Sequence, residues 1–135
     1  MTSSELQRQL VAFFEANPRD AVAVYLYGSM ARGTGTAASD VDVAILYARA
    51  PQPTLEGLPL SLEAEIERLV GRPVQVIVLN GAPSDLVHRV LRDGKLLLDR
   101  DRPARIRFEV QARNEFFDLE PIRRRYRKLT PAGRP

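Results

Sequence analysis

Two short polar motifs carry the side chains in this sequence that could do chemistry together. The first is Gly28-Ser29, directly after an apolar run, and the second is Asp40-Val41-Asp42. A glycine at a strand end lets a phosphate chain approach the backbone closely, and a helix starting at Ser29 would add N–H and hydroxyl donors. Carboxylates two residues apart on a strand lie on one face, which suits a divalent cation such as Mg²⁺. The motifs together predict a site for a metal and a phosphate chain.

Each motif alone has a more ordinary explanation. A Gly-Ser pair after a strand is most often only a turn, Asp-x-Asp recurs by chance, and Arg32 by itself would be a surface residue. The order of the motifs, with ten residues between Ser29 and Asp40, favours one shared site over separate coincidences.

The hydrophobic pattern predicts the elements that must position these motifs. Residues 21–27 are apolar and rich in β-branched and aromatic side chains, which predicts a buried strand with Tyr25 and Tyr27 in the core and Tyr27 near the site. Further strands are expected at 41–47, 74–79 and 95–98, and helices at 3–14, 30–32, 60–70, 83–93 and 103–128, the last kinked at Pro121. Loops are expected at 33–39 and 51–59, and residues 130–135 should fray.

Length and composition point to one compact domain. The chain has 135 residues, 44% of them hydrophobic, and no cysteine, so disulfides and cysteine-based zinc sites are excluded. The N-terminus has no signal-peptide pattern, and the longest apolar run is too short for a membrane span. These features favour a cytoplasmic protein without membrane contact.

Charge is distributed unevenly along the chain. Residues 1–99 carry 9 Lys/Arg and 12 Asp/Glu, a net of −3, whereas residues 100–135 carry 11 and 5, a net of +6. The densest basic run is 123–128. A solvated helix end is the simplest explanation. Docking on a partner protein is the next alternative, and direct binding of nucleic acid is disfavoured.

On the two motifs the sequence resembles the minimal nucleotidyltransferases of the DNA polymerase β superfamily. That family's signature is Gly-Ser, ten residues, then Asp-x-Asp. Its extended pattern is matched here by Gly28, Ser29, Ala31, Arg32, Gly33, Ser39, Asp40 and Asp42. The resemblance implies an α/β nucleotidyltransferase fold, a small twisted mixed sheet flanked by helices. Residues 1–100 would form this domain, and 101–135 a basic C-terminal helical extension that packs on the domain or on a partner.

The resemblance also implies a function. Many small members are antitoxins that pair with HEPN ribonuclease toxins, and some transfer AMP from ATP to a tyrosine hydroxyl of that toxin. The expected partners are therefore a cognate HEPN toxin and a nucleoside triphosphate, and a homo-oligomer is left open. The implied roles are metal binding and catalysis for Asp40 and Asp42, and nucleotide binding for Gly28, Ser29, Arg32 and Ser39.

One position departs from the family pattern. Active members usually carry a third carboxylate on a later strand, where it helps to hold metal and acts as the base. That position aligns best with Gln75, whose neutral amide offers a carbonyl oxygen but accepts no proton near neutral pH. Two interpretations stay open. In the first, transfer still occurs, with a base from elsewhere or slowly through metal and positioning; in the second, the chain is a weak or inactive module that neutralises its toxin by binding. Transfer to a small molecule such as an aminoglycoside is disfavoured, because 135 residues leave little room for a second domain.

Overall fold

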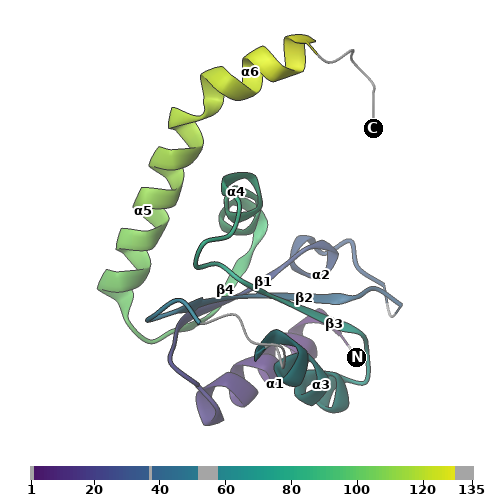
Figure 1. Cartoon of the computed structure of the whole chain (residues 1–135). Helices are drawn as coiled ribbons and strands as arrows, with labels where there is room; N and C mark the ends of the chain where they lie inside the picture. Colours follow the sequence, from purple (N-terminus) through teal and green to yellow (C-terminus); the bar gives the residue numbers. More distant parts are fainter. Residues whose placement is uncertain (1, 37, 52–57, 130–135) are drawn as a thin grey trace.

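The computed structural model describes residues 2–36, 38–51 and 58–129, which form a four-stranded sheet covered by helices (Figure 1). The strands are β1 (Ala21–Tyr27), β2 (Val41–Tyr47), β3 (Val74–Val78) and β4 (Lys95–Asp99). The helices are α1 (Ser3–Ala16), α2 (Ser29–Arg32), α3 (Leu58–Val70), α4 (Ser84–Asp93), α5 (Arg102–Asp118) and α6 (Glu120–Leu129). Most of the loop expected at 51–59, one residue of the loop at 33–39, and the tail at 130–135 lie outside the described residues.

The sheet has the order β3-β2-β1-β4 and mixes both strand directions. β1 is antiparallel to β2 and to β4, whereas β2 and β3 are parallel. The parallel pair is joined through α3, since parallel neighbours need a crossover connection. The expected small mixed sheet flanked by helices is confirmed.

Side chains alternate between the two faces of the sheet. On β2, Val41, Val43 and Ile45 belong to the core shared with α1 and α3, which we call the α1/α3 face. Ala44 and Leu46 belong to the core shared with α4 and α5, the α4/α5 face. Figure 1 shows α1 and α3 on one side of the sheet and α4 and α5 on the other. Asp42 alternates in step with Ala44 and Leu46, so its side chain lies on the α4/α5 face.

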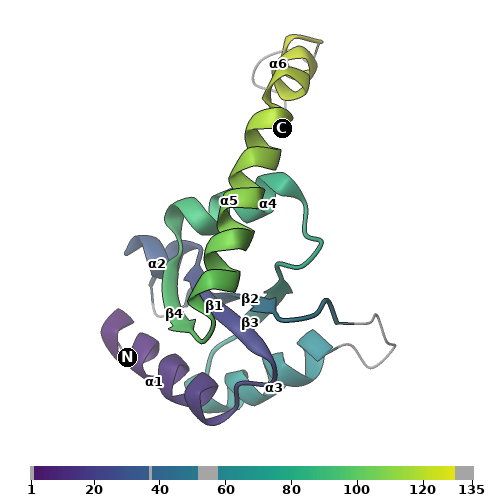
Figure 2. The same cartoon turned by 90° about the vertical axis from the view of Figure 1, so that its left-hand side faces the viewer.

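The C-terminal segment corrects one expectation. The sequence predicts a single helix over 103–128 with a kink at Pro121, but the chain forms two helices, α5 and α6, separated at Leu119. A proline has no N–H for the carbonyl four residues earlier, and its ring crowds that carbonyl. The continuous helix therefore ends before Pro121, which lies in the first turn of α6. Figure 2 shows α6 projecting beyond the domain.

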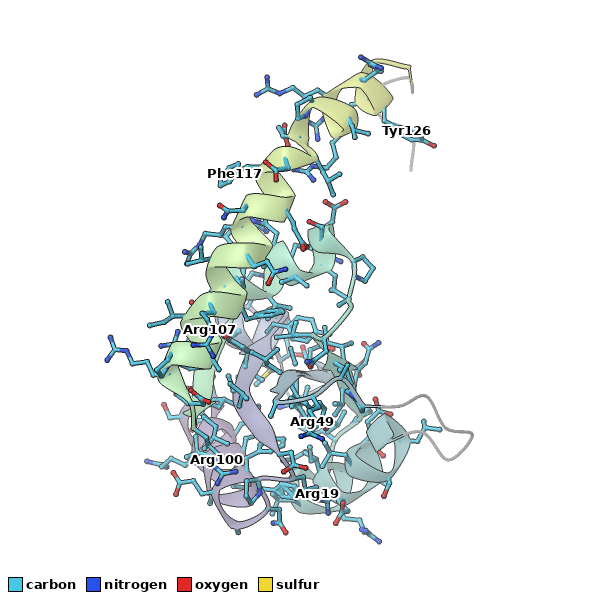
Figure 3. All side chains as sticks on the ribbon, turned by 60° about the vertical axis from the view of Figure 1, so that its left-hand side comes forward. Arg19, Arg49, Arg100, Arg107, Phe117 and Tyr126 are labelled. Carbon is cyan, nitrogen blue, oxygen red and sulfur yellow. The ribbon has the colours of Figure 1, made fainter. Side chains whose placement is uncertain are left out.

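Helix α5 is attached to the α4/α5 face by both apolar and polar contacts. Phe108 packs against the core of this face, and the Tyr25 hydroxyl donates a hydrogen bond of 2.7 Å to Glu109. Arg123 of α6 lies over the Phe116 ring and pairs with Asp85 of α4. By contrast, Phe117 is 63% exposed and projects from α5 in Figure 3. No helix within the described ranges is long and apolar enough to cross a membrane.

Candidate active site

A cleft of about 550 Å³ opens at one end of the α4/α5 face. Its floor comes from three neighbouring strands, through Tyr27 of β1, Asp42 of β2 and Gln75 of β3. These residues are direct partners in the sheet register, Tyr27 opposite Asp42 and Asp42 opposite Gln75. Directly paired residues project to the same side of a sheet, so the register alone brings the three side chains together.

Two helices form the walls of the cleft. On one side lie Gly28, Ser29 and Arg32, which begin and end the short helix α2. On the other side lie residues of α4, including Arg89 and Arg92. Because α2 follows β1 without a connecting loop, the first motif lies directly over the end of the strand that pairs with Asp42.

The contact between Gly28 and Asp42 joins the two sequence motifs. Gly28 has φ 74° and ψ −159°, a conformation that essentially only glycine adopts. A Cβ atom at this position would lie 2.3 Å from the Asp42 Oδ2 oxygen. The missing side chain is therefore what lets the carboxylate lie against the Gly28 backbone.

The electrostatics of Asp42 favour a cation. Burial raises the pKa of the Asp42 carboxyl, the negative charge of Asp40 raises it further, and the positive charge of Arg32 partly opposes the shift. The Asp40 carboxylate is thus close enough to destabilise the charge of Asp42. A divalent cation bound between them would relieve this repulsion.

The residues present fit Mg²⁺ but leave much of its coordination to other ligands. Among the described residues, no cluster of three or more His, Cys, Asp or Glu side chains could hold a metal. Mg²⁺ commonly binds one or two carboxylates and completes its octahedron with substrate phosphates and water. Asp40 and Asp42 can supply the carboxylates, and the Gln75 amide lies beside Asp42.

Two of the residues expected at the site lie outside the cleft lining. Asp40 is exposed immediately before β2 and acts on Asp42 through its charge. The Ser39 hydroxyl accepts a hydrogen bond of 2.8 Å from the Thr36 N–H, so it stabilises the loop between the motifs. The nucleotide contact of Ser39 stays a prediction.

Arg72 is a residue that sequence reasoning missed. Its guanidinium donates to the Thr36 carbonyl at 2.6 Å and also to the Ser39 carbonyl, and so ties the loop to the start of β3. In the sequence, Gly71-Arg72-Pro73 indicates only the end of a helix. No local signal could have linked it to a loop more than thirty residues earlier.

The α4 wall was also missed. Leu86, Arg89 and Asp93 line the cleft at helical spacing, but in the sequence this spacing indicates only an amphipathic helix. Tyr27 was expected in the core close to the site, and it is half-buried in the cleft floor. Burial and the Asp42 charge raise the pKa of Tyr27 to about 12, and the positive charge of Arg89 opposes that rise.

The sheet order and the placement of the two motifs define a nucleotidyltransferase-type domain. A family model described as "Polymerase beta, Nucleotidyltransferase" matches residues 8–103. The chain therefore belongs to this family. A search of curated protein sequences finds no match.

Solved structures with a similar fold include chains of toxin–antitoxin complexes. One, a toxin–antitoxin complex with AMP-PNP, has a chain of 22% identity and TM-score 0.76, covering 89% of this chain and 94% of that one. The MntA–HepT complex gives 19% identity and TM-score 0.71, with 91% and 94% covered. A Shewanella oneidensis complex of tri-AMPylated HEPN toxin with MNT antitoxin gives 20% identity and a TM-score of 0.71. The match covers 93% of this chain and 95% of that one. At these identities the likeness establishes the fold.

Proposed function

We propose that this chain is an antitoxin that transfers AMP from ATP, with Mg²⁺, to a hydroxyl of a cognate HEPN toxin in the cytoplasm, with tyrosine as the expected acceptor. The observation that carries the proposal is the contact of Asp42 with Gly28, because a carboxylate that could hold a metal then lies against the loop suited to phosphate. The descriptions of similar structures, which include AMP-PNP and an AMPylated HEPN toxin, support the choice of nucleotide and partner.

In this scheme each motif has one task. Gly28 leaves room for the Asp42 carboxylate, while Ser29 and Arg32 provide a hydroxyl and a guanidinium for the phosphate chain on the same wall of the cleft. Asp40 and Asp42 hold the metal, which when bound would offset negative charge on the phosphate oxygens. The toxin hydroxyl oxygen bonds to the α-phosphorus as the bond from that phosphorus to the bridging oxygen breaks. Pyrophosphate leaves, and the hydroxyl proton passes to water.

Gln75 lowers the rate that we expect for the transfer. It lies beside Asp42, where a third carboxylate would be placed to accept the proton. Loss of a general base typically costs about 10²–10⁴-fold in rate. We therefore expect slow transfer that depends on metal and positioning.

The test is transfer of label from ATP to the toxin by the purified chain. Asp42→Asn should lower the rate about a thousandfold, because it removes one of the two carboxylates that hold the metal. Asp20→Asn is the matched control, since it makes the same chemical change at an exposed residue at the other end of β1. Asparagine tolerates the positive φ found there. Absence of label transfer by the unaltered chain, or equal transfer by Asp42→Asn, would refute the proposal.

A second function, neutralisation by binding alone, is favoured by one observation. With Gln75 in the floor, no third carboxylate among the described residues clusters with Asp40 and Asp42. A chain carrying both Asp40→Asn and Asp42→Asn should then still protect cells that express the toxin. If the double variant binds the toxin but fails to protect, masking is excluded and transfer is required.

A further inference from the structure

We propose that Arg89 is a further nucleotide-binding residue of this site, which contacts the β- and γ-phosphates and so holds the pyrophosphate that leaves. The inference deepens the proposed function, because it assumes that the cleft binds a nucleoside triphosphate. It rests on the placement of α4, on the pairing of the neighbouring arginine, and on the charge that the site must accommodate.

Helix α4 presents one face to the cleft. Leu86, Arg89 and Asp93 line it at spacings of three and four residues, which lie along one side of a helix. The charge of Arg89 acts on the Tyr27 hydroxyl, and Tyr27 is the register partner of Asp42. Arg89 is thus across the cleft from Ser29 and within electrostatic range of the floor that carries the metal-binding carboxylate.

Pairing distinguishes Arg89 from its neighbour Arg92. The Arg92 guanidinium donates two hydrogen bonds to the Asp93 carboxylate, at 3.0 and 2.9 Å. These bonds lower the pKa of Asp93, so the carboxylate stays charged and offsets Arg92. Among the side-chain hydrogen bonds and ion pairs of the described residues, none involves Arg89. An exposed guanidinium that lines a cleft without a carboxylate partner is available to an anionic ligand.

The ligand carries more negative charge than the rest of the site can offset. The charge on Mg²⁺ would be shared with Asp40 and Asp42, and Arg32 supplies the positive charge on the α2 wall. As the bond between the α-phosphorus and its bridging oxygen breaks, further negative charge develops on the departing pyrophosphate. A guanidinium on the opposite wall stabilises that charge through its planar set of donors.

The experiment measures affinity, so it does not depend on the toxin. Dissociation constants for AMP-PNP with Mg²⁺ and for AMP are determined by calorimetry for the unaltered chain, Arg89→Gln and Arg107→Gln. The control removes the same charge from an exposed residue of α5 outside the cleft lining (Figure 3). Glutamine is a good helix former, so both variants should keep their helix content. We expect Arg89→Gln to weaken AMP-PNP about tenfold and AMP less than twofold, and Arg107→Gln to change neither.

Each outcome separates this inference from the proposed function. If the unaltered chain binds no AMP-PNP, the proposed function fails and Arg89 loses its role with it. If the unaltered chain binds AMP-PNP and Arg89→Gln binds equally well, only the inference fails. Equal weakening of AMP and AMP-PNP would also overturn it, because the lost contact would then be to the nucleoside or the α-phosphate.

Discussion

The two faces of the central sheet differ in role, although the same strands form both: one face is a closed core, and the other carries the candidate site. On the α1/α3 face, β2 contributes Val43 and Ile45, which are 0% and 1% exposed. On the α4/α5 face, the same strand contributes Asp42, which is half-buried in an open cleft. Successive residues of a strand point to opposite faces. Alternate residues of this strand therefore serve the core and the candidate site. Substitutions on one face should change stability, and substitutions on the other should change activity.

The α4/α5 face is itself divided. Its middle is apolar, with Ala44 and Leu79 buried beneath α4 and α5. Its end, at Tyr27 and Asp42, is open because the chain leaves β1 through the four-residue helix α2. A longer covering element here would fill the cleft. The open end thus leaves less apolar surface buried on the α4/α5 face. The closed α1/α3 face must therefore contribute more of the apolar burial that stabilises the fold.

The largest effect that tests this comparison is on stability. Phe14 is 2% exposed in the core of the α1/α3 face, so Phe14→Ala should lower the free energy of unfolding by about 3–5 kcal/mol. Asp42→Asn should leave it unchanged or raise it in Mg²⁺-free buffer at neutral pH, because it removes a charge that burial disfavours. Urea unfolding followed by circular dichroism measures both.

A gentler substitution keeps that test informative if Phe14→Ala does not fold. Ile45→Val removes one methyl group from the same core and should cost about 1 kcal/mol. If Asp42→Asn lowered the free energy of unfolding more than Ile45→Val does, the division of the sheet into a stabilising face and a chemical face would be wrong.

A smaller effect should follow from closing the contact between the two motifs. Gly28→Ala places a Cβ atom against the Asp42 carboxylate and forces alanine into a glycine-only conformation. Displacement of Asp42 should cost about 2 kcal/mol of binding, or about thirtyfold in affinity for AMP-PNP with Mg²⁺.

The matched control for Gly28→Ala is Gly33→Ala at the other end of α2. Gly33 also has positive φ, 79°, but a Cβ atom there would meet no other atom within 4 Å. Alanine should cost about 1 kcal/mol in stability at this position and leave the affinity for AMP-PNP within twofold. If both variants lose affinity equally, backbone conformation matters and the contact with Asp42 does not.

Much of the fold could be predicted from the sequence, because its signals are local. The apolar run at 21–27 predicts β1, and the Gly28 break predicts its end. Pro121 predicts only a kink in one long helix, whereas the constraint of that proline acts on the preceding turn and ends α5 before Leu119. Alternation of side chains along β2 also fixed which residues share a face with Asp42.

The site could be predicted only where its residues are close in sequence or carry a family pattern. The family pattern anticipated the shared site of the two motifs, and it also anticipated a neighbour for Asp42 on the later strand, where Gln75 lies. Arg72 and Arg89 come to the loop and the cleft through the packing of α3 and α4, which no local pattern specifies. Ser39 matches the family pattern, and its hydroxyl also accepts a hydrogen bond within the loop, which the pattern does not indicate.

The last predicted effect concerns Tyr25, the buried tyrosine that links the α4/α5 face to α5. Burial and the hydrogen bond to Glu109 raise the pKa of Tyr25 above its ordinary value, so the folded chain keeps this proton while the unfolded chain loses it above about pH 10. The Tyr25 contribution to the free energy of unfolding is therefore complete below pH 10 and decreases as the pH rises further. Tyr25→Phe should cost about 1.5 kcal/mol at neutral pH and reduce the alkaline loss of stability. The matched control is Tyr126→Phe, because Tyr126 is 71% exposed and should change neither quantity. Equal alkaline unfolding of Tyr25→Phe and the unaltered chain would mean that the polar link between β1 and α5 adds nothing to the stability of this face.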